Sequence, residues 1–211
     1  AALAWTLLLG ERRYLSRARY ESFRRAGVVH TLALSGMHLS VIAGAAALLL
    51  GRIIGRRWGI VVSLLIALLY VFVVGVRPSL LRALCMYALL AGALLLGRRT
   101  SPVNVLALCF LAITAFRPGY AYTLSFQLSF AALLGMFVLA PILAGAFVRV
   151  LPPLLAYPLA VSLSAVTAGA PLLVGAFDVL YPIGIIASIA VGPLVSLYLG
   201  YALLHTATLA V

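Results

Sequence analysis

Long apolar segments, separated by short turns of glycine, proline and arginine, dominate this 211-residue sequence. Seven of them approach the roughly 20 residues that an α-helix needs to cross a bilayer. They are residues 28–50, 58–76, 79–96, 102–117, 126–148, 153–177 and 183–210. Only 9% of the residues are charged, against about 25% in a soluble domain, so lipid must face much of the surface. The sequence therefore predicts an all-α, polytopic membrane bundle of about seven transmembrane helices.

A segment of a different kind precedes the first apolar run. In residues 11–27, arginines alternate with aromatic and aliphatic side chains, a pattern typical of an amphipathic helix lying in the headgroup plane. Its arginines are Arg12, Arg13, Arg17, Arg19, Arg24 and Arg25. Residues 1–9 are too short to span and are interpreted as the end of an upstream helix. We therefore divide the chain into residues 1–27, the helix end plus interfacial segment, and residues 28–211, the transmembrane domain.

Turns are predicted where glycine, proline and arginine cluster. Residues 51–57 (GRIIGRR) and 97–102 (GRRTSP) are expected to form basic turns, and Pro118-Gly119 opens an aromatic loop. Only residues 75–79 separate the second span from the third, so this hairpin is interpreted as turning below the membrane surface, shielded by protein or a wet cavity. Prolines that predict kinks inside later spans are Pro141, Pro158, Pro171 and Pro193.

The loop charges predict an orientation. If seven spans alternate, one side carries Arg52, Arg56, Arg57, Arg98, Arg99 and Arg149, whereas the other carries only Arg77, Arg117 and Asp178. The positive-inside rule makes the first side cytoplasmic. The same assignment places the arginine-rich residues 11–27 outside, against that rule. Either the span count is off by one, or basic charge is retained outside for a functional reason.

The first span holds the densest set of polar and small residues inside the predicted membrane region: His30, Ser35, Gly36, His38 and Ser40. Ser35 and His38 are three apart and share a helix face, and Gly36 permits a close backbone approach. One interpretation is a polar strip that faces a pore or a neighbouring helix, and the other is interhelical hydrogen bonding that only fixes the packing. His30 and His38 are eight residues apart with no carboxylate or cysteine nearby in sequence, so neither a metal site nor a cofactor is expected.

Two further groups of polar residues fall in later spans. Arg82 lies one turn into the third span, where a guanidinium group must snorkel to the surface, pair or face water. Asp178 is the only acidic residue after position 21, so we expect it to pair with Arg82 or Arg77. Residues 126–130 (FQLSF) set Gln127 and Ser129 among aromatics, an arrangement suited to stacking nucleic-acid bases and equally to an interfacial belt.

Taken in order, these motifs resemble the membrane domain of the ComEC/Rec2 family of competence proteins. The matching elements include residues 23–30 (FRRAGVVH), 34–39 (LSGMHL), 77–83 (RPSLLRA), 97–104 (GRRTSPVN) and 126–130 (FQLSF), and the resemblance covers essentially the whole chain. It implies a non-enzymatic, multi-pass channel of the bacterial inner membrane that takes up single-stranded DNA during natural transformation. The residues that it marks are His30, Ser35, Gly36, His38, Arg82, Gln127 and Ser129. The implied partners are single-stranded DNA, membrane lipid, other competence-machinery proteins and further domains of a longer protein.

In such a channel, the interfacial arginines would form the entrance, and Arg77, Arg82 and Arg117 would attract the phosphates. Two other classes of protein stay open. A small-solute permease also uses broken helices and midplane polar groups, although an ion-coupled carrier usually needs more carboxylates than Asp178 alone. An intramembrane serine hydrolase would use Ser35 with His38 or His205, which requires hydrogen-bond geometry and an oxyanion hole.

Overall fold

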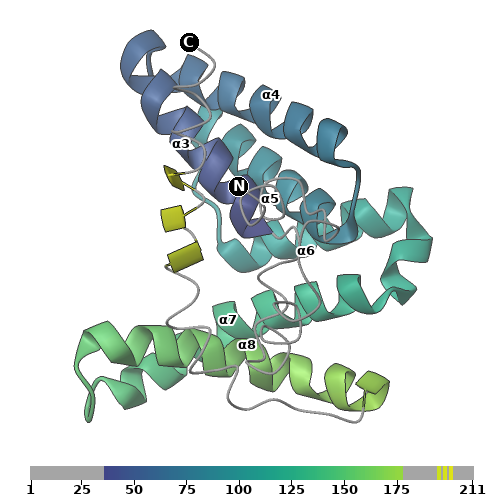
Figure 1. Ribbon diagram of the computed structural model, residues 1–211, viewed down its shortest axis with the longest axis vertical. Coiled ribbons are helices and arrows are strands. Elements are labelled where there is room, and N and C mark those ends of the chain that lie inside the picture. Colours follow the sequence, from purple (N-terminus) through teal and green to yellow (C-terminus); the bar gives the residue numbers. More distant parts are fainter. Residues whose placement is uncertain (1–35, 178–193, 196, 199, 202–211) are drawn as a thin grey trace. The chain divides into compact units, whose positions relative to one another are not determined.

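The structure, a computed structural model, describes residues 36–177 together with 194–195, 197–198 and 200–201. Every regular element within these residues is a helix, and none of them forms a strand (Figure 1). This confirms the all-α prediction for the described part of the chain. The described residues fall into two compact units, a first unit that contains residues 36–100 and a second unit that contains residues 101–177.

The first unit contains three helices, α3 (Gly36–Ile54), α4 (Arg56–Val74) and α5 (Pro78–Leu95), each of which reverses the direction of the one before (Figure 1). The predicted basic turn over residues 51–57 was wrong in extent, because helix continues to Ile54 and resumes at Arg56. Gly55 alone makes the reversal, with a φ of 85° that glycine adopts without steric cost. The hairpin predicted at residues 75–79 is confirmed as a turn, and it also begins at a glycine with positive φ, Gly75.

Close backbone contact explains why Gly51 lies inside a helix rather than in the turn. A Cβ atom at Gly59 of α4 would lie 2.6 Å from the Cα atom of Gly51 in α3 and 3.1 Å from the carbonyl oxygen of Ala47. Glycine at both positions therefore lets α3 and α4 cross with their backbones in contact, as small residues do between membrane helices.

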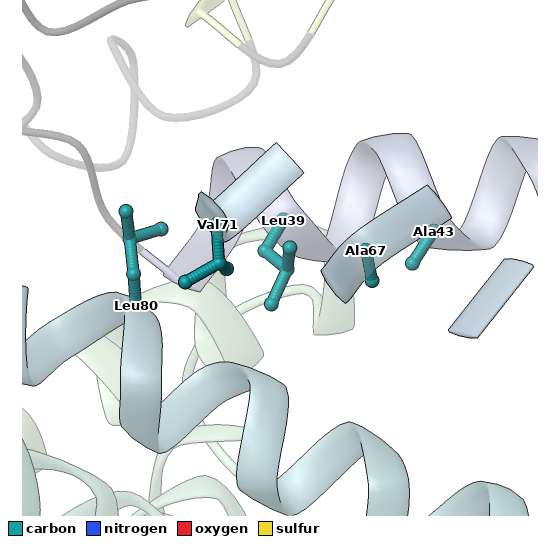
Figure 2. Close-up of a cluster of buried hydrophobic side chains, with 5 residues drawn as sticks. All are labelled: Leu39, Ala43, Ala67, Val71 and Leu80. Carbon is teal, nitrogen blue, oxygen red and sulfur yellow. The ribbon is translucent and has the colours of Figure 1, made fainter. Parts of the chain in front are cut away.

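The core of the first unit is small and draws on all three helices. Figure 2 shows the five buried side chains that form it: Leu39 and Ala43 of α3, Ala67 and Val71 of α4, and Leu80 of α5. The two residues from α3 are four apart, as are the two from α4, so each pair lies on one helix face. This packing brings the start of α3, with Gly36 and His38, beside the start of α5, with Arg77 and Arg82.

The second unit contains α6 (Pro102–Phe116), the short 3₁₀ helix η3 (Pro118–Tyr122), α7 (Leu124–Phe147) and α8 (Pro153–Phe177). Helices α7 and α8 form a close antiparallel pair (Figure 1). Alanine and serine recur every four residues along the buried face of α8, at Ala156, Ala160 and Ser164. A Cβ atom at Gly135 of α7 would lie 2.5 Å from the Cβ atom of Ala168 and 2.6 Å from the carbonyl oxygen of Ser164, so only glycine allows the two helices to approach this closely.

Prolines lie inside these two helices, as predicted. Pro141 is in α7, Pro158 and Pro171 are in α8, and Pro193 lies outside the described residues. The aromatic loop predicted after Pro118 is the 3₁₀ helix η3.

Five of the described helices, α3, α4, α5, α7 and α8, are long and apolar enough to cross a bilayer. Large apolar side chains such as Ile53, Phe72 and Leu154 are at least 79% exposed, which suits a lipid environment and would be unfavourable in water. The described chain is thus that of a multi-pass membrane protein. The predicted count of seven spans is not confirmed, because α6 has only 15 residues and most of 183–210 lies outside the described residues. The interfacial segment at 11–27 also lies outside them.

Candidate functional site

Two residues singled out in the sequence, Gly36 and Arg82, meet in the first unit. A Cβ atom at Gly36 would lie 3.1 Å from the Cβ atom of Ala83 and 3.4 Å from the Nη2 atom of Arg82. The missing side chain of Gly36 therefore leaves room for α5 and for the guanidinium group at the start of α3. The Nε atom of Arg82 is buried, while the residue as a whole is partly exposed.

His38 lies one residue before the core residue Leu39 and is fully buried, and its Nε2 atom is inaccessible to solvent. Ser40, from the same predicted polar strip, is exposed and donates a hydrogen bond to the carbonyl oxygen of Gly36 at 2.9 Å. Its hydroxyl group therefore bonds to its own helix.

Arg77 is the N-cap residue of α5 and is exposed, and Pro78 occupies the first helical position. The positive end of the α5 dipole, Arg77 and Arg82 all contribute positive potential at this end of the first unit. Such an end attracts anions. Because a helix N-terminus disfavours cations, neither arginine is placed there for the stability of the helix.

Acidic residues are missing from a long part of the sequence. Nine of the fifteen arginines lie between residues 36 and 177, but Glu11, Glu21 and Asp178 all lie outside that range. Residues 36–177 therefore contain no carboxylate that could pair with Arg77 or Arg82. The predicted pair with Asp178 involves a residue outside the described part and stays a prediction.

In the second unit, the aromatic residues of the FQLSF motif pack together. Phe126 and Phe130 have ring centroids 4.4 Å apart, and both rings contact Phe110 of α6 at centroid distances of 5.6 and 5.3 Å. Phe126 is 1% exposed and Phe130 is 8% exposed, so these rings join α6 to the start of α7. Aromatic clusters of this kind stabilise helix contacts beyond their buried area.

The polar residues of the same motif lie at the junction of η3 and α7. The Nε2 atom of Gln127 donates a hydrogen bond to the carbonyl oxygen of Ala121 at 3.0 Å, and this bond ties the 3₁₀ turn to the helix. Ser129 is partly exposed. Arg117 is exposed at the C-terminal end of α6, where the helix dipole favours a cation.

Several predicted site residues lie outside the described part of the chain. They are His30, Ser35, Asp178 and the interfacial Arg12, Arg13, Arg17, Arg19, Arg24 and Arg25. Among the described residues, no group of three or more His, Cys, Asp and Glu side chains is placed to hold a metal ion.

Sequence reasoning missed one polar contact between helices. The hydroxyl oxygens of Ser63 in α4 and Tyr87 in α5 lie 2.5 Å apart, and Ser63 is fully buried. The signal was available, because Ser63 is the only hydroxyl-bearing residue in the apolar run 59–69. A single hydroxyl group in such a run usually bonds to a neighbouring helix.

Comparison with known proteins gives consistent matches. Residues 7–211 match the family described as competence protein. The chain is 31% identical over 126 residues to ComE operon protein 3 of Bacillus subtilis (strain 168), an alignment that covers 59% of this chain and 16% of that protein. It is 30% identical over 210 residues to an uncharacterized protein of Aquifex aeolicus (strain VF5), covering 99% of this chain and 48% of that protein. The chain thus spans about half or less of the length of these relatives, and no solved structure matches it.

Proposed function

The chain belongs to the competence protein family, and from this membership we propose that it forms a channel for single-stranded DNA in the bacterial inner membrane during natural transformation. Its membrane-capable helices supply the scaffold that such a channel needs. The similarity to ComE operon protein 3 supports a role in competence. Single-stranded DNA would require cationic groups for its phosphates and a polar route through the apolar bundle.

The observation that carries this proposal is the position of Arg82 against Gly36. A guanidinium group inside a membrane helix is costly, and such residues usually serve a ligand pathway. Here the neighbouring helix has a glycine whose Cβ atom, if present, would lie in van der Waals contact with the guanidinium group, 3.4 Å from Nη2 of Arg82. Phosphodiester oxygens are suitable ligands for this group, because arginine binds phosphate through paired charge-assisted hydrogen bonds.

The proposed path groups residues by role. The cationic positions are Arg77, Arg82 and Arg117, and the polar and small lining positions are His30, Ser35, Gly36, His38, Gln127 and Ser129. The interfacial arginines of residues 11–27 would form the entrance. Further competence proteins and the additional domains of a longer protein would deliver the strand. The chain itself would carry out no chemical reaction.

The lack of carboxylates in residues 36–177 and the burial of His38 favour this channel over a permease and a serine hydrolase. A proton- or sodium-coupled permease needs carboxylates in its membrane helices, and residues 36–177 contain none. A serine hydrolase would need a base close to Ser35, whereas His38, one of its two candidate bases, is buried beside the apolar core.

The test is uptake of labelled DNA by naturally competent cells whose own gene carries the substitution. Arg82→Gln should lower uptake about tenfold or more, because a hydrogen bond to a charged group contributes roughly 1.5–3 kcal/mol. Arg82→Lys should retain part of the uptake, since it keeps the charge but not the planar fork. Arg149→Gln, which removes an exposed arginine between α7 and α8, is the matched control and should behave like the wild type.

Protein in the membrane fraction must be quantified for each variant, so that loss of uptake is separated from loss of protein. Normal uptake by both Arg82→Gln and Arg77→Gln, at normal protein levels, would overturn the role of these arginines in a DNA path.

A further inference from the structure

A cavity of about 630 Å³ lies among the three helices of the first unit. Its apolar wall includes Ala47 of α3, Ile60 of α4, and Leu90 and Leu94 of α5. Leu94 is 54% exposed, so this wall continues onto the lipid-facing surface. The volume falls within the range of about 300–1,000 Å³ that is usual for small-molecule sites.

The cavity exists because residues with small side chains line it. Gly44 lines it, and a Cβ atom built at Gly44 would meet no atom within 4 Å. Tyr87 also lines it, and its hydroxyl group is held by Ser63, so the ring has a fixed position in the wall. The interior therefore offers apolar surface and few polar groups.

One part of the cavity is strongly basic. Arg98, Arg99 and Thr100 line it directly after the end of α5. The backbone fixes their position: the N–H group of Arg98 donates to the carbonyl oxygen of Ala93 at 2.8 Å, and that of Gly97 donates to Leu94 at 3.2 Å. With Gly97 at a φ of 66°, these two bonds form a Schellman motif, which ends the helix and leads the chain across its C-terminus.

Positive charge accumulates at this end of the unit because of the helix order. Helix α3 ends, α4 begins and α5 ends on the same side, so Arg52, Arg56 and Arg57 share it with Arg98 and Arg99. No acidic residue occurs between positions 36 and 177 to neutralise them. Adjacent guanidinium groups with a nearby hydroxyl group form a suitable site for a phosphate group.

We propose that this cavity binds an anionic phospholipid, with its headgroup phosphate on Arg98 and Arg99 and one acyl chain along Gly44, Ala47 and Leu94. Basic pockets between transmembrane helices bind such headgroups on the cytoplasmic side, which is the side predicted for these arginines from the loop charges. The apolar interior favours an acyl chain over a nucleotide, because a base would need partners for its polar edges. This inference does not depend on the proposed DNA path.

The test is native mass spectrometry of the purified protein in detergent, titrated with phosphatidylglycerol or with phosphatidylethanolamine of the same acyl chains. We expect preferential retention of phosphatidylglycerol. The double variant Arg98→Gln/Arg99→Gln should bind it roughly thirtyfold more weakly, since each arginine near a headgroup contributes about 1 kcal/mol. Arg149→Gln, an exposed arginine of the second unit, should bind like the wild type.

The acyl chain needs its own arm of the experiment. Gly44→Leu should fill the cavity and weaken binding, whereas Gly145→Leu, at an exposed glycine of α7 with open space around it, should not. Glycerol phosphate, which has the headgroup phosphate without acyl chains, should fail to displace the lipid from the wild-type protein. This displacement measurement tests the role of the acyl chain even if Gly44→Leu does not fold.

The proposal would be overturned by equal retention of the two lipids, by unchanged binding of the double arginine variant, or by displacement of the lipid by glycerol phosphate. Displacement by a short single-stranded oligonucleotide would also overturn it and would assign the site to nucleic-acid phosphate. Because no arm measures DNA uptake, failure here is distinguishable from failure of the channel proposal.

Discussion

The hydroxyl groups of Ser63, which is fully buried, and Tyr87, which is partly buried, form a hydrogen bond between α4 and α5, with 2.5 Å between the two oxygens. Ser63 also donates to the carbonyl oxygen of Ile60 at 2.8 Å. A hydroxyl group has one proton, so while Ser63 donates to Ile60 the Tyr87 hydroxyl is the donor in the bond between the helices. The two partners of this bond are therefore not equivalent.

This asymmetry predicts unequal effects of removing either partner. Ser63→Ala leaves the Tyr87 donor without its acceptor, whereas Tyr87→Phe leaves Ser63 bonded to Ile60. We expect Ser63→Ala to cost about 1–2 kcal/mol of unfolding free energy and Tyr87→Phe less. Unfolding in detergent would measure both, and the double variant would give a coupling of about 0.6 kcal/mol. A larger loss for Tyr87→Phe would contradict the assigned donor.

Gly59→Ala should separate α3 from α4. The added Cβ atom would lie 2.6 Å from the backbone of Gly51, which cannot move away as a side chain can. We expect a loss of about 1–3 kcal/mol, as in overpacked cores, despite the better helix propensity of alanine. Gly92→Ala in α5 is the control, because a Cβ atom there meets nothing within 4 Å, and it should be neutral or stabilising. Equal melting temperatures of the two variants would contradict this contact.

Gly135→Ala should loosen α7 against α8 in the same way, since its Cβ atom would meet the carbonyl oxygen of Ser164 at 2.6 Å. Cys109 is fully buried in this unit, so a thiol-reactive dye would detect its exposure as the unit melts. In a Cys85→Ser background, only Cys109 reports, because the sequence has two cysteines. We expect Gly135→Ala to lower the temperature of labelling and Gly145→Ala, in open space on the same helix, to leave it unchanged.

Gln127→Glu tests the bond that secures η3. The substitution preserves shape but replaces the donor to Ala121 with a carboxylate oxygen, which repels that carbonyl group. We expect a loss of roughly 1–3 kcal/mol in the second unit, read by the same labelling of Cys109. Asn104→Asp makes the equivalent change at an exposed amide in the first turn of α6 and should cost nothing there. An unchanged labelling temperature for Gln127→Glu would show that the bond contributes no stability.

The helices were predictable from the sequence wherever an apolar run was long and bounded by glycine or proline. Helices α4, α5, α7 and α8 begin within two residues of the predicted spans. Pro78 and Pro153 fix φ at the first helical position, and Gly55 permits the positive φ that the turn before α4 requires. Prediction failed at residues 51–57, where Gly51 belongs to a helix. A glycine required for close helix contact looks the same in sequence as one required for a turn.

The candidate site was predictable only as residue types. The position of Arg82 one turn into a predicted span indicated that its guanidinium group must reach the surface, pair or face water. Its contact with Gly36, forty-six positions earlier, depends on how α3 and α5 pack. The aromatic side chains of residues 126–130 were interpreted as base-stacking or interfacial groups, because the sequence does not show that Phe110 lies against them. Periodicity identifies a helix face, and tertiary packing decides what that face contacts.

The single residue between α3 and α4 also restricts motion. Gly55 is the one residue between α3 and α4, and the backbones of Gly51 and Gly59 are in contact beside it. Sliding or separation of the two helices is therefore restricted near this end. We therefore expect a conformational change in this unit to move α3 and α4 together. The turn at Gly75, which joins α4 to α5, is where we expect α5 to change its position relative to that pair.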